Sequence, residues 1–413
     1  MHRVVICLAF LALCVSALRG EEWSEFRGPT GQGHAAARNL PLHWSSTDHV
    51  AWSKAIPGKG WSSPVLCQGK LYLTTAVPGA GSEQSLRAVC LDAGTGEIRW
   101  NVQVFQQADG QSSPRIHSKN SHASASPITD GKRLFVHFGA QGTACLDFDG
   151  KIVWKTRELK YAPVHGNGGS PVLVDDLLVV SCDGGDLQFL AALEQATGKI
   201  RWKTPRPGDA PKKFAFSTPL VIEVGGKKQI VSSGANSVGG FDPGDGHEIW
   251  RVRYDGYSTV PRPVFGLGLL FIGTGYDSPS LIAVRPDGLG DVTDTHVVWT
   301  IKKGAPLNPS PLLIGQELYL IDDGGVATCL DAQTGKTHWQ KRIGGTFSAS
   351  PLFADGKIYL QSEDGEGIVL KPGLEFEELA RNPLGERSLA SYAVADGALF
   401  IRTEKHLTRF EGQ

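Results

Sequence analysis

The residues that could do chemistry in this chain lie mainly in its longer loops, and three of them are histidines. His117, His122 and His165 fall in two neighbouring loops, at residues 107–122 and 159–169. Imidazole nitrogens are common metal ligands, but no HExxH or comparable spacing selects these three. Because a loop histidine is more often solvated or hydrogen-bonded to the chain, the sequence indicates no metal site.

The same loops carry further groups that could hold a ligand. They supply amide and carboxylate oxygens, positive charge and flat aromatic faces, and such groups converging at a concave surface predict a binding site. The candidate binding residues are Trp61, His117, Lys119, Asn120, His122, His165, Asn167, Tyr257, Arg262, Asp277, Asn308 and Glu363.

Members of this set could bind a metal ion or could serve only the structure of the loops. Glu363, Asp277 and Asn308 have oxygen atoms that suit calcium, although no motif selects them. Asn120 and Asn167 could equally satisfy loop backbone groups, as asparagine commonly does. The chain shows no nucleophile-elbow pattern, and its GNGG segment at residues 166–169 is too short for a phosphate loop. We therefore assign no catalytic residue and no metal ligand.

Such loops need a rigid scaffold, and a repeated sequence motif predicts the fold of that scaffold. Its clearest copies are CLDAGTGEIRW (90–100), ALEQATGKIRW (192–202), GFDPGDGHEIW (240–250) and CLDAQTGKTHW (329–339). Each is an apolar run, a turn built on Asp and Gly, and the start of another strand. A second hairpin precedes each copy, so the unit is four strands, a to d, as in a propeller blade.

Counting the units predicts how the ring closes. Eight a-b-c segments begin near residues 62, 124, 169, 217, 260, 309, 349 and 389, but only seven d strands follow them. A spare strand at 49–58 is expected to complete the last blade and remove the free sheet edge. The fold class is therefore all-β, an eight-bladed β-propeller closed by an N-terminal strand, with its d–a and b–c loops at one mouth.

The repeated tryptophans are expected to be structural. They are expected to dock between neighbouring blades, each burying about 150–250 Å², or roughly 4–6 kcal/mol before costs. In the seventh copy, which lacks the tryptophan, Phe376 is expected to replace it. The docking positions are Trp52, Trp100, Trp154, Trp202, Trp250, Trp299 and Trp339.

The first residues of the sequence and its composition predict where the protein is located and which partners it does not bind. Residues 1–20 have a basic start, an apolar core and small residues near their end, which predicts a signal peptide followed by one domain at 21–413. Formal net charge is −1, which argues against nucleic acid. We expect an exported, soluble monomer, periplasmic or extracellular, whose cysteines at 67, 90, 145, 182 and 329 are unpaired and buried.

The AxDxxTGxxxW phrase resembles the tryptophan-docking repeat of the pyrroloquinoline-quinone (PQQ) propellers. That family has eight blades and includes quinoprotein alcohol and glucose dehydrogenases and the propeller lipoprotein of the outer-membrane barrel-assembly machinery. Residues 21–33 and 40–44 resemble the start of secreted bacterial PQQ-like repeat proteins of unassigned activity. The repeat is specific for the fold and unspecific for function.

Two functions are compatible with this resemblance. The sequence favours a non-enzymatic binding or scaffold propeller that presents its mouth to a protein or glycan partner. The alternative is a quinoprotein-type oxidoreductase binding PQQ and calcium at the same mouth. The resemblance implies, for a working PQQ site, calcium ligands, a catalytic Asp, a Trp floor and often a disulfide between adjacent cysteines, and this chain has no Cys-Cys pair. We therefore expect no cofactor.

Overall fold

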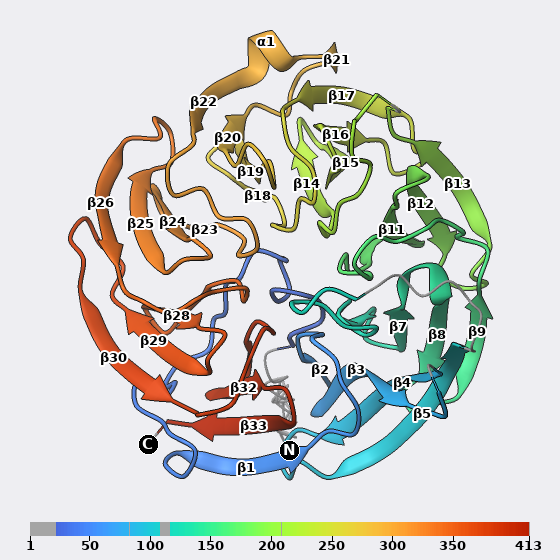
Figure 1. Cartoon of the computed structure of the whole chain (residues 1–413), viewed down its shortest axis with the longest axis vertical. Helices are drawn as coiled ribbons and strands as arrows, with labels where there is room; N and C mark the ends of the chain where they lie inside the picture. The colour runs from blue at the N-terminus through green and yellow to red at the C-terminus, as the bar shows by residue number, and fades with distance from the viewer. Residues whose placement is uncertain (1–21, 82, 108–115, 208, 413) are drawn as a thin grey trace, which may run out of the picture.

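The computed structural model describes residues 22–81, 83–107, 116–207 and 209–412, and these residues form an eight-bladed β-propeller. Eight sheets stand around a central axis, with their first strands innermost (Figure 1). Seven sheets have four strands and one has five. This confirms the predicted fold; the proposed signal peptide at 1–20 lies outside the described residues.

The blades follow the chain in order. The first blade consists of β2 (Val65–Cys67), β3 (Lys70–Pro78), β4 (Gln84–Asp92) and β5 (Ile98–Gln107), and the second of β6 (Ile128–Thr129), β7 (Arg133–His137), β8 (Thr143–Asp147) and β9 (Ile152–Thr156). The third blade consists of β10 (Val172–Val174), β11 (Leu177–Asp183), β12 (Gln188–Glu194) and β13 (Ile200–Pro205), and the fourth of β14 (Leu220–Val224), β15 (Lys227–Ser233), β16 (Ser237–Phe241) and β17 (Glu248–Arg253). The fifth blade consists of β18 (Val264–Gly266), β19 (Leu269–Gly273), β20 (Leu281–Val284) and β22 (Val297–Ile301), and the sixth of β23 (Leu312–Ile314), β24 (Glu317–Ile321), β25 (Val326–Asp331) and β26 (Thr337–Arg342). The seventh blade consists of β27 (Leu352–Ala354), β28 (Lys357–Gln361), β29 (Glu366–Leu370) and β30 (Glu378–Pro383), and the eighth of β31 (Ala393–Ala395), β32 (Ala398–Arg402), β33 (His406–Glu411) and β1 (Val50–Ala55).

Short elements interrupt this pattern in two places. A 3-10 turn, η1 (Gly139–Gln141), lies between β7 and β8. In the fifth blade, the connection from β20 to β22 carries α1 (Thr293–His296) and β21 (Gly290–Asp291), which pairs in parallel with β17 of the fourth blade. Neither α1 nor any other helix among the described residues has the length and apolar character needed to cross a membrane.

The ring is closed by the N-terminal strand, as predicted. β1 pairs antiparallel with β33, with Val50 opposite Phe410 and Ala55 opposite His406. The hydroxyls of Ser53 and Thr408 add a side-chain hydrogen bond of 2.8 Å across this pair. Because the last blade combines the two ends of the domain, no blade is left with three strands.

The geometry of the c–d turn explains why the same residue types recur there along the chain. Asp92 Oδ1 accepts hydrogen bonds from the backbone N–H groups of Gly94 and Thr95, at 3.0 and 2.9 Å. Gly96 has a φ of 72°, and a Cβ there would lie 2.6 Å from the Trp52 ring. The turn therefore needs glycine for its positive φ and for a tryptophan packed flat against it.

Six of the seven repeat tryptophans dock on the next blade. Trp202, for example, is 8% exposed and donates its indole N–H to Pro243 O at 2.9 Å. A Cβ on Gly246 of that turn would lie 2.5 Å from the same ring. The other five indole donors and carbonyl acceptors are Trp52 and Ala93, Trp100 and Phe148, Trp154 and Gln195, Trp299 and Ala332, and Trp339 and Gly373.

Trp250 departs from this scheme. It is fully buried among side chains of the fourth and fifth blades, but its indole N–H bonds within its own blade, to Gln229 Oε1 at 2.7 Å. The reason lies in the fifth blade, whose long β20–β22 connection replaces the tight turn on which the ring would lie.

The expectation that Phe376 replaces the missing tryptophan of the seventh copy is wrong. Ala380 occupies that register position, opposite Val369, and Phe376 packs instead against Trp339 at 5.3 Å. Trp44, from the segment before β1, fills the space: it is 2% exposed and stacks on Tyr359 at 6.2 Å.

All five described cysteines, Cys67, Cys90, Cys145, Cys182 and Cys329, are unpaired and buried. Burial raises the pKa of the Cys67 thiol to about 11 and that of Cys90 to about 12. These side chains therefore act as small apolar residues between strands.

Candidate functional site

A cavity of ≈320 Å³ lies on the propeller axis. Its wall is built from the loops that lead into the inner strands of all eight blades, with Tyr276 added from the β19–β20 turn. These are the loops expected to form one mouth. Seven of the candidate residues line the cavity: Trp61, His117, Lys119, Asn120, His165, Tyr257 and Asn308.

The floor of the cavity comes from the N-terminal segment at residues 22–35. Figure 1 shows this segment in blue, crossing the centre of the ring. It bonds to inner strands of several blades: Trp23 pairs with Leu66, and Phe353 N–H donates to Gly33 O at 2.7 Å. Phe26 lines the cavity. The segment therefore makes a blind pocket out of what would otherwise be a channel.

Arg262 belongs to this floor and not to the mouth where it was predicted. It is 2% exposed, and its guanidinium lies 2.8 Å from Glu25 Oε2. It also donates to Phe26 O at 2.7 Å and to Pro219 O at 2.9 Å. Burial raises the pKa of Glu25, and Arg262 partly offsets that rise. Arg262 thus holds the N-terminal segment across the axis and is not available to a ligand.

A second arginine lies beside it. Arg27 is 1% exposed and donates to Pro311 O at 2.7 Å. Burial, together with the positive charge of Arg262, lowers the pKa of Arg27 to about 9. Glu25 pairs with Arg262, whereas Arg27 donates to a backbone carbonyl, so the floor depends on backbone carbonyls as well as on charge.

His122 and Asn167 lie in a different place from the axial cavity. They line a separate void of ≈20 Å³, together with Gln107. Burial lowers the pKa of His122, and Asn167 Oδ1 accepts from Tyr161 Oη at 3.0 Å. A void of this size holds about one water molecule. The three predicted histidines therefore do not form one cluster, although His117 and His165 pack edge to face at 5.5 Å.

Asp277 lies at the exposed rim. Lys212 Nζ is 3.1 Å from Asp277 Oδ2 and 2.8 Å from Tyr257 Oη, and it lies 4.1 Å from the centre of the Tyr257 ring. These contacts hold the Tyr257 ring at the edge of the cavity.

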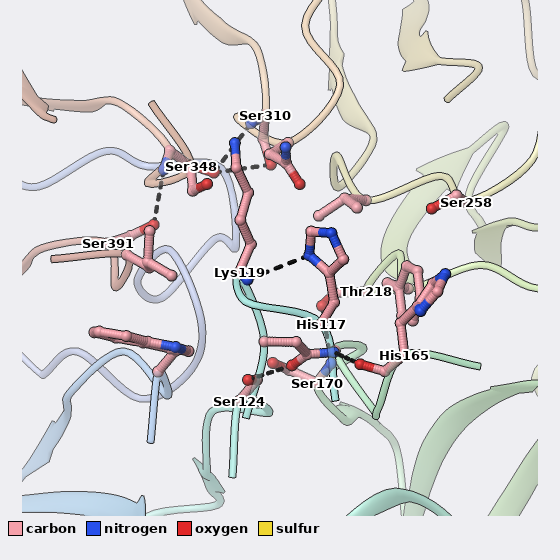
Figure 2. A pocket seen from close by; sticks show the side chains of 18 of the residues that line it. His117, Lys119, Ser124, His165, Ser170, Thr218, Ser258, Ser310, Ser348 and Ser391 are labelled. Atoms are coloured by element: carbon pink, nitrogen blue, oxygen red, sulfur yellow. Dashed lines mark hydrogen bonds between the residues drawn. The ribbon is translucent and has the colours of Figure 1, made fainter. Parts of the chain in front are cut away.

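Lys119 spans the mouth. Figure 2 shows its side chain running from the side of Ser124 toward Ser310 and Ser348. Its ammonium lies 2.8 Å from Glu363 Oε1 and 3.8 Å from Asp323 Oδ1. It thereby ties the loop before the second blade to turns of the sixth and seventh blades; we call these contacts the latch.

Neighbouring groups complete the latch. Glu363, 8% exposed, also accepts from Ser348 Oγ at 2.7 Å, and Asn308 donates its side-chain amide to Asp323 Oδ1. On the other side of the lysine, Asn120 Nδ2 donates to His165 O at 3.0 Å. The rim is therefore held by charge and by hydrogen bonds at both ends of Lys119.

A ring of hydroxyls around the axis was missed by the sequence reasoning. In seven blades a serine or threonine stands just before the inner strand, and its oxygen accepts the backbone N–H of the corresponding residue in the preceding blade. The hydroxyl ring comprises Ser63, Ser126, Ser170, Thr218, Ser310, Ser350 and Ser391, with distances of 2.8–3.0 Å. In the fifth blade Arg262 takes the position and donates its own N–H to Ser310.

The sequence contains a repeated signal for this hydroxyl ring. Six of the seven hydroxyl residues are followed by proline, as in Ser63-Pro64, Ser126-Pro127 and Thr218-Pro219. Proline has no N–H and favours an extended residue before it, which suits the entry of an inner strand. A search for repeated Ser-Pro pairs would have found the ring.

Aromatic side chains form one wall of the cavity. Phe214 packs edge to face against Tyr257 at 5.2 Å and against Phe216 at 5.9 Å, and Tyr257 lies 6.5 Å from Tyr276. His165 joins the row at 5.6 Å from Phe214. Together with Trp61 these rings give the cavity flat apolar faces above the hydroxyl ring.

Comparison with known proteins places the chain in a family. The model of the PQQ_2 family, described as outer membrane protein assembly factor BamB, matches residues 42–210, 91–261, 145–292 and 234–373, which together cover more than half of the chain. The chain belongs to this family. As a member of the PQQ_2 family, it has the repeats that the sequence analysis identified.

One relative and one solved structure with the same description are also similar to this chain, the solved structure in its fold. The outer membrane protein assembly factor BamB of Yersinia pestis is 24% identical over 323 residues, covering 75% of this chain and 65% of that protein. The chain thus matches a little less than two thirds of that relative's length. BamB from Moraxella catarrhalis has a TM-score of 0.53 at 17% identity, covering 78% of this chain and 98% of that structure.

A quinohemoprotein alcohol dehydrogenase, ADHIIG from Pseudomonas putida HK5, has a similar fold. Its TM-score is 0.65 at 10% identity, with coverage of 95% of this chain and 80% of that one. At this identity the likeness concerns the fold alone.

The residues of this PQQ_2 member do not fit calcium-bound PQQ at the axial cavity. No Asp or Glu occurs among the described residues that line it. Of the three residues with suitable oxygens, Asp277 pairs with Lys212, Glu363 with Lys119, and Asn308 with Asp323. Calcium takes six to eight oxygen ligands, usually including carboxylates. Glu363 and Asp323 are the two carboxylates that approach each other near the cavity among the described residues, and the ammonium of Lys119 already lies 2.8 and 3.8 Å from them.

Proposed function

We propose that this protein is an exported, non-enzymatic binding propeller of the cell envelope that holds a partner at its loop-rich mouth. The observation that carries the proposal is the blind cavity on the axis, to which all eight blades contribute and which the N-terminal segment closes from below. The family match to the BamB model supports a scaffold role and an envelope location.

The arrangement of polar groups favours binding over catalysis. The oxygens of the hydroxyl ring accept backbone N–H groups from the neighbouring blade, so they join blades together. The carboxylates of Glu363 and Asp323, near the cavity, are both engaged by Lys119. A general base or nucleophile needs a free partner within hydrogen-bond reach, and the latch uses these groups for structure.

The rigid ring and its latched rim suggest how a partner is held. Eight inner strands fix the ends of the loops, and the loops then place Tyr257, Tyr276 and Lys119 at one surface. A surface built in this way is preorganised, so little conformational entropy is lost when a partner binds.

Titration with PQQ in the presence of calcium tests this function against an oxidoreductase. The full protein has ten tryptophans, and Trp61 lines the cavity, so PQQ bound there would quench tryptophan fluorescence. We expect no saturable quenching and no dye-linked oxidation of alcohols or sugars. Saturable quenching that requires calcium, together with turnover, would reject the scaffold function.

A further inference from the structure

We infer that the axial cavity binds a neutral, polyhydroxylated ligand of one or two sugar rings, such as the end of a glycan. The inference rests on the proposed function, because it names the chemistry of what the same mouth holds. Charge, hydrogen-bonding capacity and shape each point to this class.

The charge of the lining argues against an anionic ligand. Lys119 is the one lysine or arginine among the described lining residues, and Glu363 and Asp323 lie 2.8 and 3.8 Å from its ammonium. The lining therefore offers no unpaired lysine or arginine to a carboxylate or phosphate, and Arg387, which lies over the Trp61 ring, is not among the described lining residues. A cation also lacks a partner in the lining, because Glu363 faces Lys119, Asp323 also accepts from Leu307 N, Asn308 N and Asn308 Nδ2, and neither carboxylate lines the cavity. The ligand that fits is therefore uncharged.

The hydroxyl ring supplies groups that both donate and accept. Ser63, Ser126 and Ser170 are 2–4% exposed, line the cavity, and each accept one backbone N–H. A serine hydroxyl has one hydrogen to donate and a second lone pair, so each retains capacity for a further bond. A ligand bearing several hydroxyls matches such groups better than one that only donates or only accepts.

The distribution of these hydroxyls favours a ring-shaped ligand. The propeller places them around the circumference of the cavity, one from each contributing blade. A ligand must therefore present polar atoms around its own edge. His117 adds a donor from the rim: its Nδ1 accepts the backbone N–H of Lys119 at 3.2 Å, so the proton of the neutral ring lies on Nε2.

Two of the aromatic side chains that line the cavity come from opposite sides of the axis. Trp61 precedes the first blade and Tyr257 precedes the fifth, so they lie half a turn apart in an eight-bladed ring. A pyranose has apolar C–H faces and a polar edge, which suits two flat rings with hydroxyls between them. The cavity of ≈320 Å³ is at the lower end of the range for small-molecule sites, and the Phe26 floor limits its depth.

Isothermal titration of the full protein with neutral disaccharides tests the inference. The probes are maltose, cellobiose, lactose and N,N′-diacetylchitobiose, with digalacturonate as a charged compound of the same ring type. We expect at least one neutral disaccharide to bind at millimolar concentration or below, and digalacturonate to bind at least ten-fold more weakly than that disaccharide. Absence of binding by all four neutral probes, or tighter binding of digalacturonate, would overturn the assignment.

Four variants locate the binding. Tyr257→Ala should weaken binding at least ten-fold, whereas Leu374→Ala, an exposed residue 58% accessible in the β29–β30 turn, should leave it unchanged. Thr218→Val removes one hydroxyl of the ring at nearly constant shape, and Thr218→Ser restores it. Loss with valine and rescue by serine, with thermal melting followed in each, would separate ligand contact from a folding defect. Equal binding by all variants would show that the sugar binds elsewhere.

These outcomes are distinct from failure of the proposed function. A protein that binds no sugar but still holds a partner at the mouth would refute this inference and leave the scaffold function intact. A protein that binds PQQ with calcium would refute both.

Discussion

The ammonium of Lys119 lies 2.8 Å from the carboxylate of Glu363, although the two residues are in loops of the second and seventh blades. The Lys119 side chain is 30% exposed and that of Glu363 is 10% exposed. This pair is a polar connection across the mouth of the cavity. The mouth of the cavity is therefore held in part by an ion pair.

Replacing Lys119 with methionine should loosen the rim with little effect on the propeller. A partly exposed ion pair contributes about 1 kcal/mol or less, so global stability should fall only slightly. Amide hydrogen exchange at residues 116–122 should rise by at least three-fold. Lys371→Met is the matched control, because its pair with Glu377 is exposed and remote from the mouth. Equal exchange in both variants would mean that the pair does not hold the loop.

Trp44 should matter as much as a repeat tryptophan. It fills the gap between blades at Tyr359, so Trp44→Ala should cost about 3–5 kcal/mol, similar to Trp202→Ala. Phe376→Ala should cost about 1 kcal/mol, because that ring is only half-buried at the edge of Trp339. Urea denaturation of the three variants measures the difference. A larger loss for Phe376→Ala than for Trp44→Ala would contradict the packing described.

Arg262→Ala should destabilise the fold strongly. The substitution leaves the Glu25 carboxylate buried without its partner and removes bonds to Phe26 O and Pro219 O. Loss of one member of a buried pair costs about 3–5 kcal/mol. Chemical denaturation checks this value, and His122→Ala is the comparison, expected to lose less than about 2 kcal/mol. A loss under about 1 kcal/mol for Arg262→Ala would show that the floor does not depend on the contacts of Arg262.

Deleting residues 21–58 should abolish cooperative folding. The deletion removes both the floor segment and β1, and so exposes the edge of β33 and the inner strands. Thermal melting followed by circular dichroism should show no sharp transition. A truncated protein that melts cooperatively near the temperature of the full chain would mean that ring closure contributes little.

The repeat carried enough information to predict the blades, the closing strand and the mouth to which the loops contribute. Periodicity constrains these features, because each blade buries its faces only against its neighbours. Trp44 was not expected to dock because it lies outside the repeat. Arg262 was expected at the surface because an arginine in a loop gives no indication of a buried partner, and Glu25 is 237 residues away. The hydroxyl ring was not predicted because the repeat was recognised from its strands and turns and not from the residues just before each inner strand.

The measurement that tests the central claim most directly is site-specific photo-crosslinking in the native envelope. A photoreactive residue at Tyr276, 44% exposed at the mouth, is compared with one at Leu374, 58% exposed in the β29–β30 turn. The account predicts a discrete crosslinked partner from position 276, reduced by Tyr257→Ala, and none from position 374. Crosslinks from position 374 alone, or equal crosslinks from both positions, would contradict the claim that the mouth is the working surface.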